Sequence, residues 1–356
     1  MSDWRTDPTQ LSPRSKRLLW STFVGLVLAC IIALIPLPYA ILRPGPATNT
    51  LGTTSDGKPL VDIKGASTYP TSGGLDFTTV RVSGGPGRRV NAWDLLGAWM
   101  NPHDEIFRED QLFPKGSTSK QIEEQNAAEM AGSQSEAAAI ALRSLGKKVG
   151  ESYVVAALTE GAPSASVLKV GDVITAVDGR PVTALIDIQN QVRTHQPGDS
   201  VEVTVSREGS SQTVTTTTIA ADGRPVLGVR LRMDFDFPFE VTIHAGDVGG
   251  PSAGTMFALA IRDVLTPGEM TGGKQIAGTG TIDDDGIVGP IGGIRQKIVG
   301  AKEAGATFFL APADNCAELV GHVPDGITAV KIATFDQAVS AVEKIAAGQG
   351  DLSSCG

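Results

Sequence analysis

The stretch that decides the fold is residues 289–312, which read GPIGGIRQKIVGAKEAGATFFLAP. After its two central glycines come Ile294, Lys297, Ile298 and Ala301, at positions i, i+3, i+4 and i+7 of a helix. This spacing predicts a helix with a buried apolar stripe that includes Lys297. Burial lowers the pKa of an ammonium group, and a neutral amine can act as a general base. The alternative interpretation is a lysine with a buried stem whose charged end reaches water.

A second glycine-rich stretch, AGDVGGPSAG at residues 245–254, precedes apolar residues at helical spacing from Met256 to Leu265. Ser252 therefore lies where a loop becomes a helix. Two roles fit a serine there. It can be an N-cap, which stabilises a helix by about 1 kcal/mol. It can also be a nucleophile, because free N–H groups at a helix start can hold an oxyanion and a lysine can serve as its base.

These two stretches resemble the proteolytic domain of the Lon proteases, which are Ser-Lys peptidases. GPSAG at residues 250–254 and the motif at 289–312 carry the resemblance, which extends over about Phe239 to Ala346. It implies that Ser252 is the nucleophile and Lys297 the general base. It also implies that Thr279 helps to orient the lysine, and that Gly250 and Ala253 support the serine loop.

The sequence departs from the Lon pattern in two respects. Gly249 stands where Lon has an acidic residue, and Asp247 lies two positions further back, so an acidic helper is in doubt. Lon's ATPase module is missing, and residues 268–275 only approach a phosphate-binding loop, because Gln275 replaces the required Ser or Thr. We therefore expect no cofactor and no bound nucleotide. The four histidines are scattered without an HExxH motif, so no metal site is expected either.

Residues 164–182, SASVLKVGDVITAVDGRPV, have a different character, with an Asp-Gly hairpin turn and a helix face from Leu185 to Val192 after it. This segment resembles the PDZ domain of bacterial envelope proteases, in which an extended peptide adds to a strand beside a helix. The resemblance places the strand at residues 154–158 and a carboxylate-binding loop near residues 150–151. The implied peptide-binding residues are Val154, Val155, Leu185 and Ile188. The alternative is a spacer domain without a peptide ligand.

An apolar run near the N-terminus predicts a membrane anchor. Leu18 to Leu42 contains no charged residue, and 25 residues of helix measure roughly 37 Å, enough to cross a bilayer. Arg14, Lys16 and Arg17 precede it, and positive residues stay in the cytoplasm. We expect a single-pass protein of the cell membrane with its N-terminus inside and the PDZ and catalytic domains outside. A cleaved signal peptide is the alternative.

The amino-acid composition excludes some classes of function for this protein. Among 356 residues, 39 are acidic and 30 basic, and the net charge of −9 argues against nucleic-acid binding. Hydrophobic residues make up 41%, which is enough for a sizeable core. Three cysteines, Cys30, Cys316 and Cys355, form neither a disulfide framework nor a zinc motif, and the redox state of the last two stays open.

The fold class expected is α+β, a Lon-type proteolytic domain with an inserted PDZ domain after one transmembrane helix. The layout resembles the membrane-anchored PDZ-containing Lon-like proteases of bacteria. The expected segments are a tail (1–17), a transmembrane helix (18–42), a linker or extended entry strand (43–60), the first part of the Lon-like domain (61–148), the PDZ domain (149–222), the rest of the Lon-like domain (223–350) and a tail (351–356). Within the first part, Thr118 with Gln121 and Ser133 with Glu136 have the spacing of capping boxes that open an Ala-rich helical stretch ending at Gly146.

The function predicted is an ATP-independent, membrane-anchored serine endopeptidase that cleaves unfolded or tagged polypeptides outside the membrane. A homo-oligomer is implied by the resemblance alone, since Lon rings are hexamers. Two alternatives remain. One is a membrane-tethered PDZ adaptor with an inactive protease domain. The other is an α/β-hydrolase, because residues 250–254 also fit G-x-S-x-G, with His322 as the downstream histidine.

Overall fold

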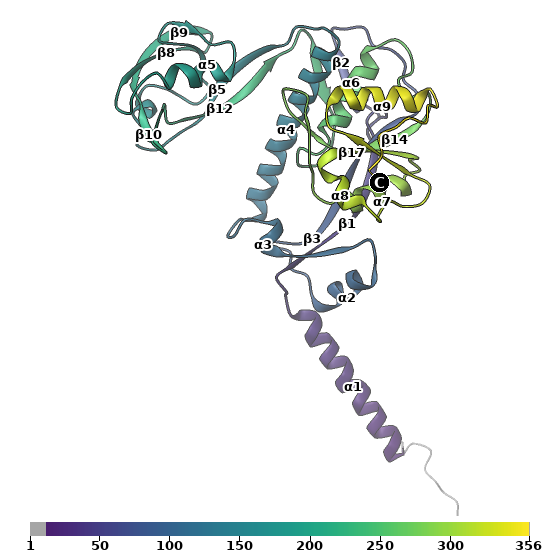
Figure 1. Cartoon of the computed structure of the whole chain (residues 1–356). Helices are drawn as coiled ribbons and strands as arrows, with labels where there is room; N and C mark the ends of the chain where they lie inside the picture. The colour runs from purple at the N-terminus through teal and green to yellow at the C-terminus, as the bar shows by residue number, and fades with distance from the viewer. Residues whose placement is uncertain (1–11, 356) are drawn as a thin grey trace, which may run out of the picture.

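The structure, a computed structural model, describes residues 12–355. Helix α1 (Pro13–Leu34) projects alone from the body, as Figure 1 shows. Within the described residues it is the one helix long and apolar enough to cross a membrane, and its apolar window is entirely unburied. The expected end at Leu42 is wrong, because residues 39–42 belong to a strand in which Ala40 and Ile41 are fully buried. Pro36 and Pro38 prevent the helix from continuing.

The body is built on a mixed sheet of six strands in the order β18-β17-β14-β3-β1-β4. Its middle strand β14 runs parallel to both β3 and β17, whereas β1 is antiparallel to its neighbours β3 and β4. Of the two interpretations of residues 43–60, a linker or an extended entry strand, the strand is right for residues 43–49, which lie in β1. The strands are β1 (Tyr39–Asn49), β3 (Gly74–Gly84), β4 (Glu105–Arg108), β14 (Gln275–Gly278), β17 (Phe308–Pro312) and β18 (Thr328–Ile332).

Helices cover both faces of this sheet. Side chains alternate along the strands, so that Ile276 and Leu310 join one core while Ala277 and Phe309 join the other. The first core includes α4 (Ser119–Ser144), α6 (Gly254–Leu265) and α9 (Phe335–Ala346), and the second includes α7 (Ile294–Glu303) and α8 (Cys316–Leu319). A disulfide joins Cys316 to Cys355 beside the second core.

The chain on both sides of residues 150–236 contributes to the body. Helix α4 packs on α6, β3 pairs with β14, and β2 (Val61–Lys64) pairs with β13 (Glu240–Ile243). Helix α4 begins with the expected Thr118–Gln121 capping box. Smaller elements complete the body: α2 (Ala92–Met100), α3 (Glu109–Leu112), β15 (Thr281–Ile282), β16 (Val288–Gly289) and the 3-10 turn Ala313–Asn315.

A separate sheet stands away from the body at the end of a two-stranded ribbon (Figure 1). Its order is β12-β5-β6-β8-β9, with β7 paired to β6. The expected boundary at residue 222 falls before β12, which pairs with β5 along its whole length. The elements are β5 (Gly150–Leu158), the 3-10 turn Pro163–Ser166, β6 (Val173–Val177), β7 (Arg180–Pro181), α5 (Leu185–Val192), β8 (Ser200–Arg207), β9 (Ser210–Thr217), β10 (Ile219–Ala221), β11 (Arg224–Val226) and β12 (Val229–Asp236).

Candidate active site

Ser252 lies in the turn that leads into α6. The N-cap of α6 is Ala253, and no side chain caps this helix. The interpretation of Ser252 as a capping residue is therefore wrong, since its hydroxyl makes no hydrogen bond to the first turn. The half-buried side chain instead lines a cleft of about 930 Å³.

Lys297 approaches Ser252 from the opposite face of the sheet. It lies in the first turn of α7, whose N-cap Gly293 has φ 71°, and a Cβ there would come within 2.8 Å of Leu42 and Val80. The Lys297 side chain is only 3% exposed, and its Nζ lies 2.8 Å from Ser252 Oγ. This contact excludes the interpretation in which the ammonium reaches water. The two side chains form a Ser–Lys pair at the end of β14.

Burial determines the protonation state of the Lys297 amine in this pair. Desolvation lowers the pKa of Lys297 to about 7, because a charged ammonium is costly away from water. Within residues 12–355 no carboxylate forms an ion pair with it. Asp247 lines the cleft but is exposed, and no described hydrogen bond joins it to Lys297. A substantial fraction of the amine is therefore neutral near pH 7.

Thr279 connects the two residues. It follows the last residue of β14 and is fully buried. Lys297 Nζ donates to Thr279 Oγ1 at 3.0 Å, and Thr279 Oγ1 donates to the carbonyl oxygen of Ser252 at 2.9 Å. The backbone N–H of Gly280 donates to the same carbonyl at 2.8 Å. Thr279 thus holds the amine and the serine backbone in one arrangement.

Two backbone donors beside the serine are unpaired in the described chain. The N–H groups of Ser252 and Ala253 make no hydrogen bond within residues 12–355, whereas Gly254 N–H is bonded to Pro251 O at 3.3 Å. Gly250, at φ 85°, makes the turn that brings these groups to the start of α6. Unpaired N–H groups at a helix start can hold an oxyanion.

Helix α4 holds the loop that carries Ser252. The sequence pattern did not predict this contact. Ser133 Oγ donates to Pro251 O at 2.9 Å, and Gly250 N–H donates to Asn126 O at 3.0 Å. Ser133 is 2% exposed and lies in mid-helix. The second expected capping box, Ser133 with Glu136, is therefore wrong. The buried serine on an apolar helix face was the available signal, because a buried hydroxyl needs a partner.

The alternative Ser–His arrangement is absent from the structure. His322 is exposed and lines a different cavity, together with His103 and Gln296. No described contact joins it to Ser252. The part of the chain that the structure describes also holds no group of three or more His, Cys, Asp or Glu residues suited to a metal.

The PDZ-like sheet carries a groove of about 530 Å³ between α5 and β12. Leu185 and Ile188 line it, as expected, but the strand expected beside them is wrong. Val154 and Val155 are 4% and 0% exposed and are hydrogen-bonded on both sides, to β12 and to the β6 side. The strands that line the groove are β12, which stands at the edge of the sheet, and the short strands β10 and β11.

The expected carboxylate-binding loop near residues 150–151 is wrong as well. Gly150 pairs with Asp236, and the carboxylate of Glu151 accepts from Arg143 and Tyr153. Both residues lie at the end of β5 next to the body. Neither residue lines the groove.

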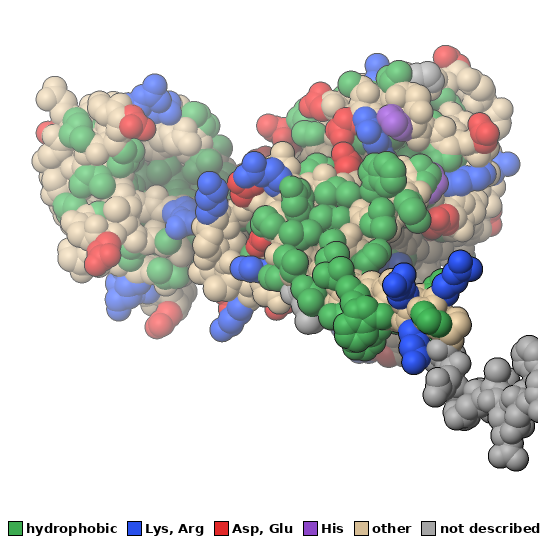
Figure 2. All heavy atoms as spheres, turned by 90° about the horizontal axis from the view of Figure 1, so that it is seen from below, with side chains coloured by type: hydrophobic (Ala, Val, Ile, Leu, Met, Phe, Trp, Pro, Cys, Tyr) green, Lys and Arg blue, Asp and Glu red, His purple; other side chains and the backbone are tan. Residues whose placement is uncertain are grey.

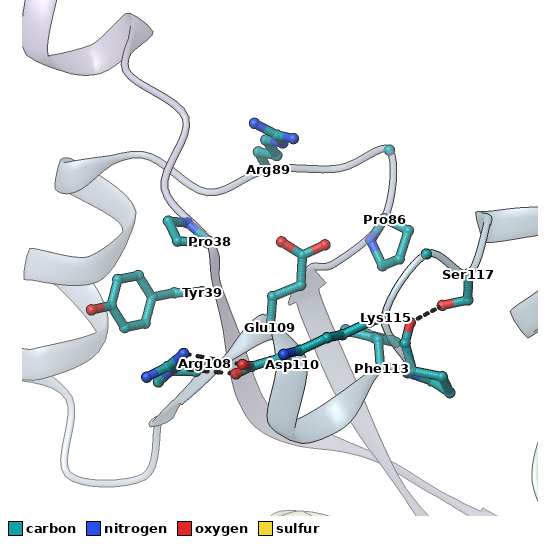
Figure 3. A pocket seen from close by; sticks show the side chains of 13 residues that line it. Pro38, Tyr39, Pro86, Arg89, Arg108, Glu109, Asp110, Phe113, Lys115 and Ser117 are labelled. Atoms are coloured by element: carbon teal, nitrogen blue, oxygen red, sulfur yellow. Dashed lines mark hydrogen bonds and ion pairs between the residues drawn. The ribbon is translucent and has the colours of Figure 1, made fainter.

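Another cavity, of about 550 Å³, lies close to the C-terminal end of α1 (Figure 3). Neither Ser252 nor Lys297 lines it. Arg108 forms an ion pair with Asp110 there, at 3.0 Å. The side chains labelled in Figure 3 are Pro38, Tyr39, Pro86, Arg89, Arg108, Glu109, Asp110, Phe113, Lys115 and Ser117.

Comparison with known proteins identifies both domains. Residues 232–347 match the family model of the Lon protease (S16) C-terminal proteolytic domain, and residues 129–218 match that of the PDZ domain. Lon protease 1 of Bacillus subtilis is 32% identical over 111 residues, which are 29% of this chain and 14% of that protein. Lon protease 1 of Sorangium cellulosum is 39% identical over 108 residues, 28% of this chain and 13% of that protein.

Lon protease 2 of Herpetosiphon aurantiacus is 30% identical over 179 residues, covering 47% of this chain and 19% of that protein. The chain thus spans between about one eighth and one fifth of the length of these relatives. The structure adds the Ser252–Lys297 geometry within the domain that matches the Lon proteolytic model.

Proposed function

We propose that this chain, which contains a Lon-type proteolytic domain and a PDZ domain, is an ATP-independent serine endopeptidase. Ser252 is the nucleophile and Lys297 its general base. The observation that carries this assignment is the 2.8 Å contact between Lys297 Nζ and Ser252 Oγ, made by a lysine that is 3% exposed.

The geometry supports a complete catalytic cycle. Neutral Lys297 takes the proton of Ser252 Oγ as this oxygen attacks the scissile carbonyl carbon. The N–H groups of Ser252 and Ala253 stabilise the oxyanion that forms. The ammonium then returns the proton to the leaving amine, and water hydrolyses the acyl-enzyme by the same route. Thr279 keeps the amine aimed at the serine throughout.

The proposed location is the outer face of a membrane. Helix α1 would span it, with Arg14, Lys16 and Arg17 on the cytoplasmic side. The disulfide between Cys316 and Cys355 supports this topology, because such bonds persist in oxidising compartments. Thiol labelling of intact cells, with and without reductant, tests it. Two free thiols in the body under non-reducing conditions would contradict the topology.

The PDZ groove would select the substrate. An extended polypeptide would add to the free edge of β12 and place side chains against Leu185 and Ile188 of α5. The Lon-type domain, which follows in sequence, would then bind this polypeptide in its cleft. Because the proposed enzyme uses no ATP-driven unfolding, unfolded or tagged polypeptides would be the substrates. The hexamer implied by the resemblance to Lon would be tested by light scattering.

Cleavage of an unstructured protein by the full-length chain in detergent or nanodiscs, without ATP, tests the proposal. We expect fragments from the wild type and none from Ser252→Ala. A serine-directed covalent probe run in parallel should label the wild type only. If the probe labels neither protein and no fragments form, the endopeptidase proposal fails and the chain acts as a tethered adaptor.

A further inference from the structure

Helix α2 exposes an unusual number of large apolar side chains on one face. Trp93, Leu96, Trp99 and Met100 are 48%, 44%, 77% and 69% exposed. They recur at helical spacing, so they share a face. The opposite face is held in place, because Leu95 and Ala98 pack against β1 in a small core. A well-anchored helix therefore presents an apolar surface that the described chain does not cover.

This surface is continuous with the lipid-facing surface of α1. Trp93 Nε1 donates to Ala29 O on α1 at 3.2 Å, and Leu37 N–H, just beyond α1, donates to Val90 O at 2.8 Å. Figure 2 looks at the molecule from the side on which α1 leaves it, and hydrophobic side chains gather there. The two helices thus present one apolar surface.

The position of the contact along α1 sets the depth of α2. Ala29 lies five residues before the end of α1, or about 8 Å along its axis. Interfacial helices bury their apolar face about 5–10 Å into the boundary between headgroups and acyl chains. Tryptophan is enriched at this level because its ring is apolar and its N–H is polar.

The charged residues on and near α2 agree with a position of this helix at the same depth in the membrane interface. The only charged residue on α2, Asp94, accepts a hydrogen bond from Asn91 N–H in the capping box. Arg89 and Lys115 line the cavity of Figure 3, are exposed and form no salt bridge within residues 12–355. Cations at this level can pair with lipid phosphates.

We propose that α2 lies in the outer interface of the lipid bilayer as a second membrane contact beside α1. This rests on the membrane anchor of the proposed function. A single helix leaves a body free to tilt, whereas two contacts fix its orientation. The catalytic cleft, which Leu42 of β1 lines, is then held at a fixed height above the membrane.

Fluorescence quenching by brominated phosphatidylcholine in nanodiscs tests this proposal on the full-length chain. A thiol-reactive fluorophore is attached at Trp99→Cys, in a Cys30→Ser background. Cys30 itself, on α1, is the positive control, and Val170→Cys, 63% exposed in the turn before β6, is the matched negative control. Leu96→Cys is a second reporter on the same face, and circular dichroism checks that each variant is folded.

We expect brominated lipid to lower the emission at residues 96 and 99 roughly two-fold, as for a group 5–10 Å below the headgroups, and to leave residue 170 unchanged. Quenching at Cys30 with none at residues 96 and 99 overturns the proposal while α1 still spans the membrane. A second copy of the chain covering α2 would give that result. Absence of quenching at Cys30 would instead show that the anchor itself, and the proposal with it, is wrong.

Discussion

The cleft that holds Ser252 and the PDZ groove differ in how far their side chains are buried and their polar groups hydrogen-bonded. In the cleft, Lys297 is almost fully buried and fixed by two hydrogen bonds, one to Ser252 and one to Thr279. In the groove, Leu185 is 38% exposed and β12 is an unpaired edge. The first site gains reactivity from desolvation, and the second gains binding capacity from unsatisfied backbone groups.

This difference predicts how strongly substitutions in each site should affect cleavage. A buried pair works through the pKa and position of one amine, so its loss should abolish chemistry for every substrate. An open groove contributes binding energy spread over several contacts, so its loss should be partial and depend on the substrate. Four measurements, ordered from the largest expected effect to the smallest, separate the two sites.

The largest effect is expected for the Ser–Lys pair. Ser252→Ala or Lys297→Ala should lower the cleavage rate by at least about 10³-fold, because nucleophile and base act as a unit. Lys302→Met is the matched control, since Lys302 lies on the same helix but is exposed and donates to Gly326 O. It should keep the wild-type rate within about two-fold. Activity that survives in Lys297→Ala but is lost in His322→Ala would favour the α/β-hydrolase instead.

Thr279→Val should have the next largest effect. It removes the hydroxyl that contacts Lys297 Nζ and the Ser252 carbonyl, at 3.0 and 2.9 Å, and so misplaces the base. We expect kcat to fall about 10² -fold with KM little changed. Thr279→Ser should recover most of the rate. If Thr279→Ser is as slow as Thr279→Val, packing of the methyl group rather than the hydroxyl matters.

The pH dependence should follow the amine of Lys297. Only the neutral amine accepts a proton, and its pKa lies at about 7, so the neutral fraction rises with pH. The kcat/KM value should increase about ten-fold between pH 6 and pH 8 and then level off. Initial rates with a peptide substrate across this range provide the measurement. A flat profile from pH 6 to pH 9 would contradict the role of Lys297 as the base.

The smallest effect is expected in the groove. Leu185→Asp places a charge where a bound polypeptide would pack, and should weaken cleavage of an unfolded protein by about ten-fold or less. Hydrolysis of a short peptide should not change. Val170→Asp, exposed in the turn before β6 and outside the groove, is the control. Equal losses for the protein and the short peptide would show that the groove affects the cleft rather than the choice of substrate.

The sequence alone was sufficient to select the two residues that the structure brings together in the cleft. Ser252 and Lys297 each lie within a short motif, and the helical spacing around Lys297 already predicts its burial. Local patterns also identified α6, α7 and the capped start of α4. Such features depend on residues a few positions apart, whose geometry the backbone repeats.

Only the tertiary structure decided which distant segments lie together. The sequence could not show that β12, rather than β5, forms the edge beside α5, because strand pairing joins residues about 75 positions apart. It likewise did not show that residues 39–42 leave the apolar run to enter the central sheet, or that Ser133 of α4 supports the Pro251 carbonyl. An apolar segment has the same sequence pattern whether lipid or protein covers it. Only the tertiary structure shows which of the two is its partner.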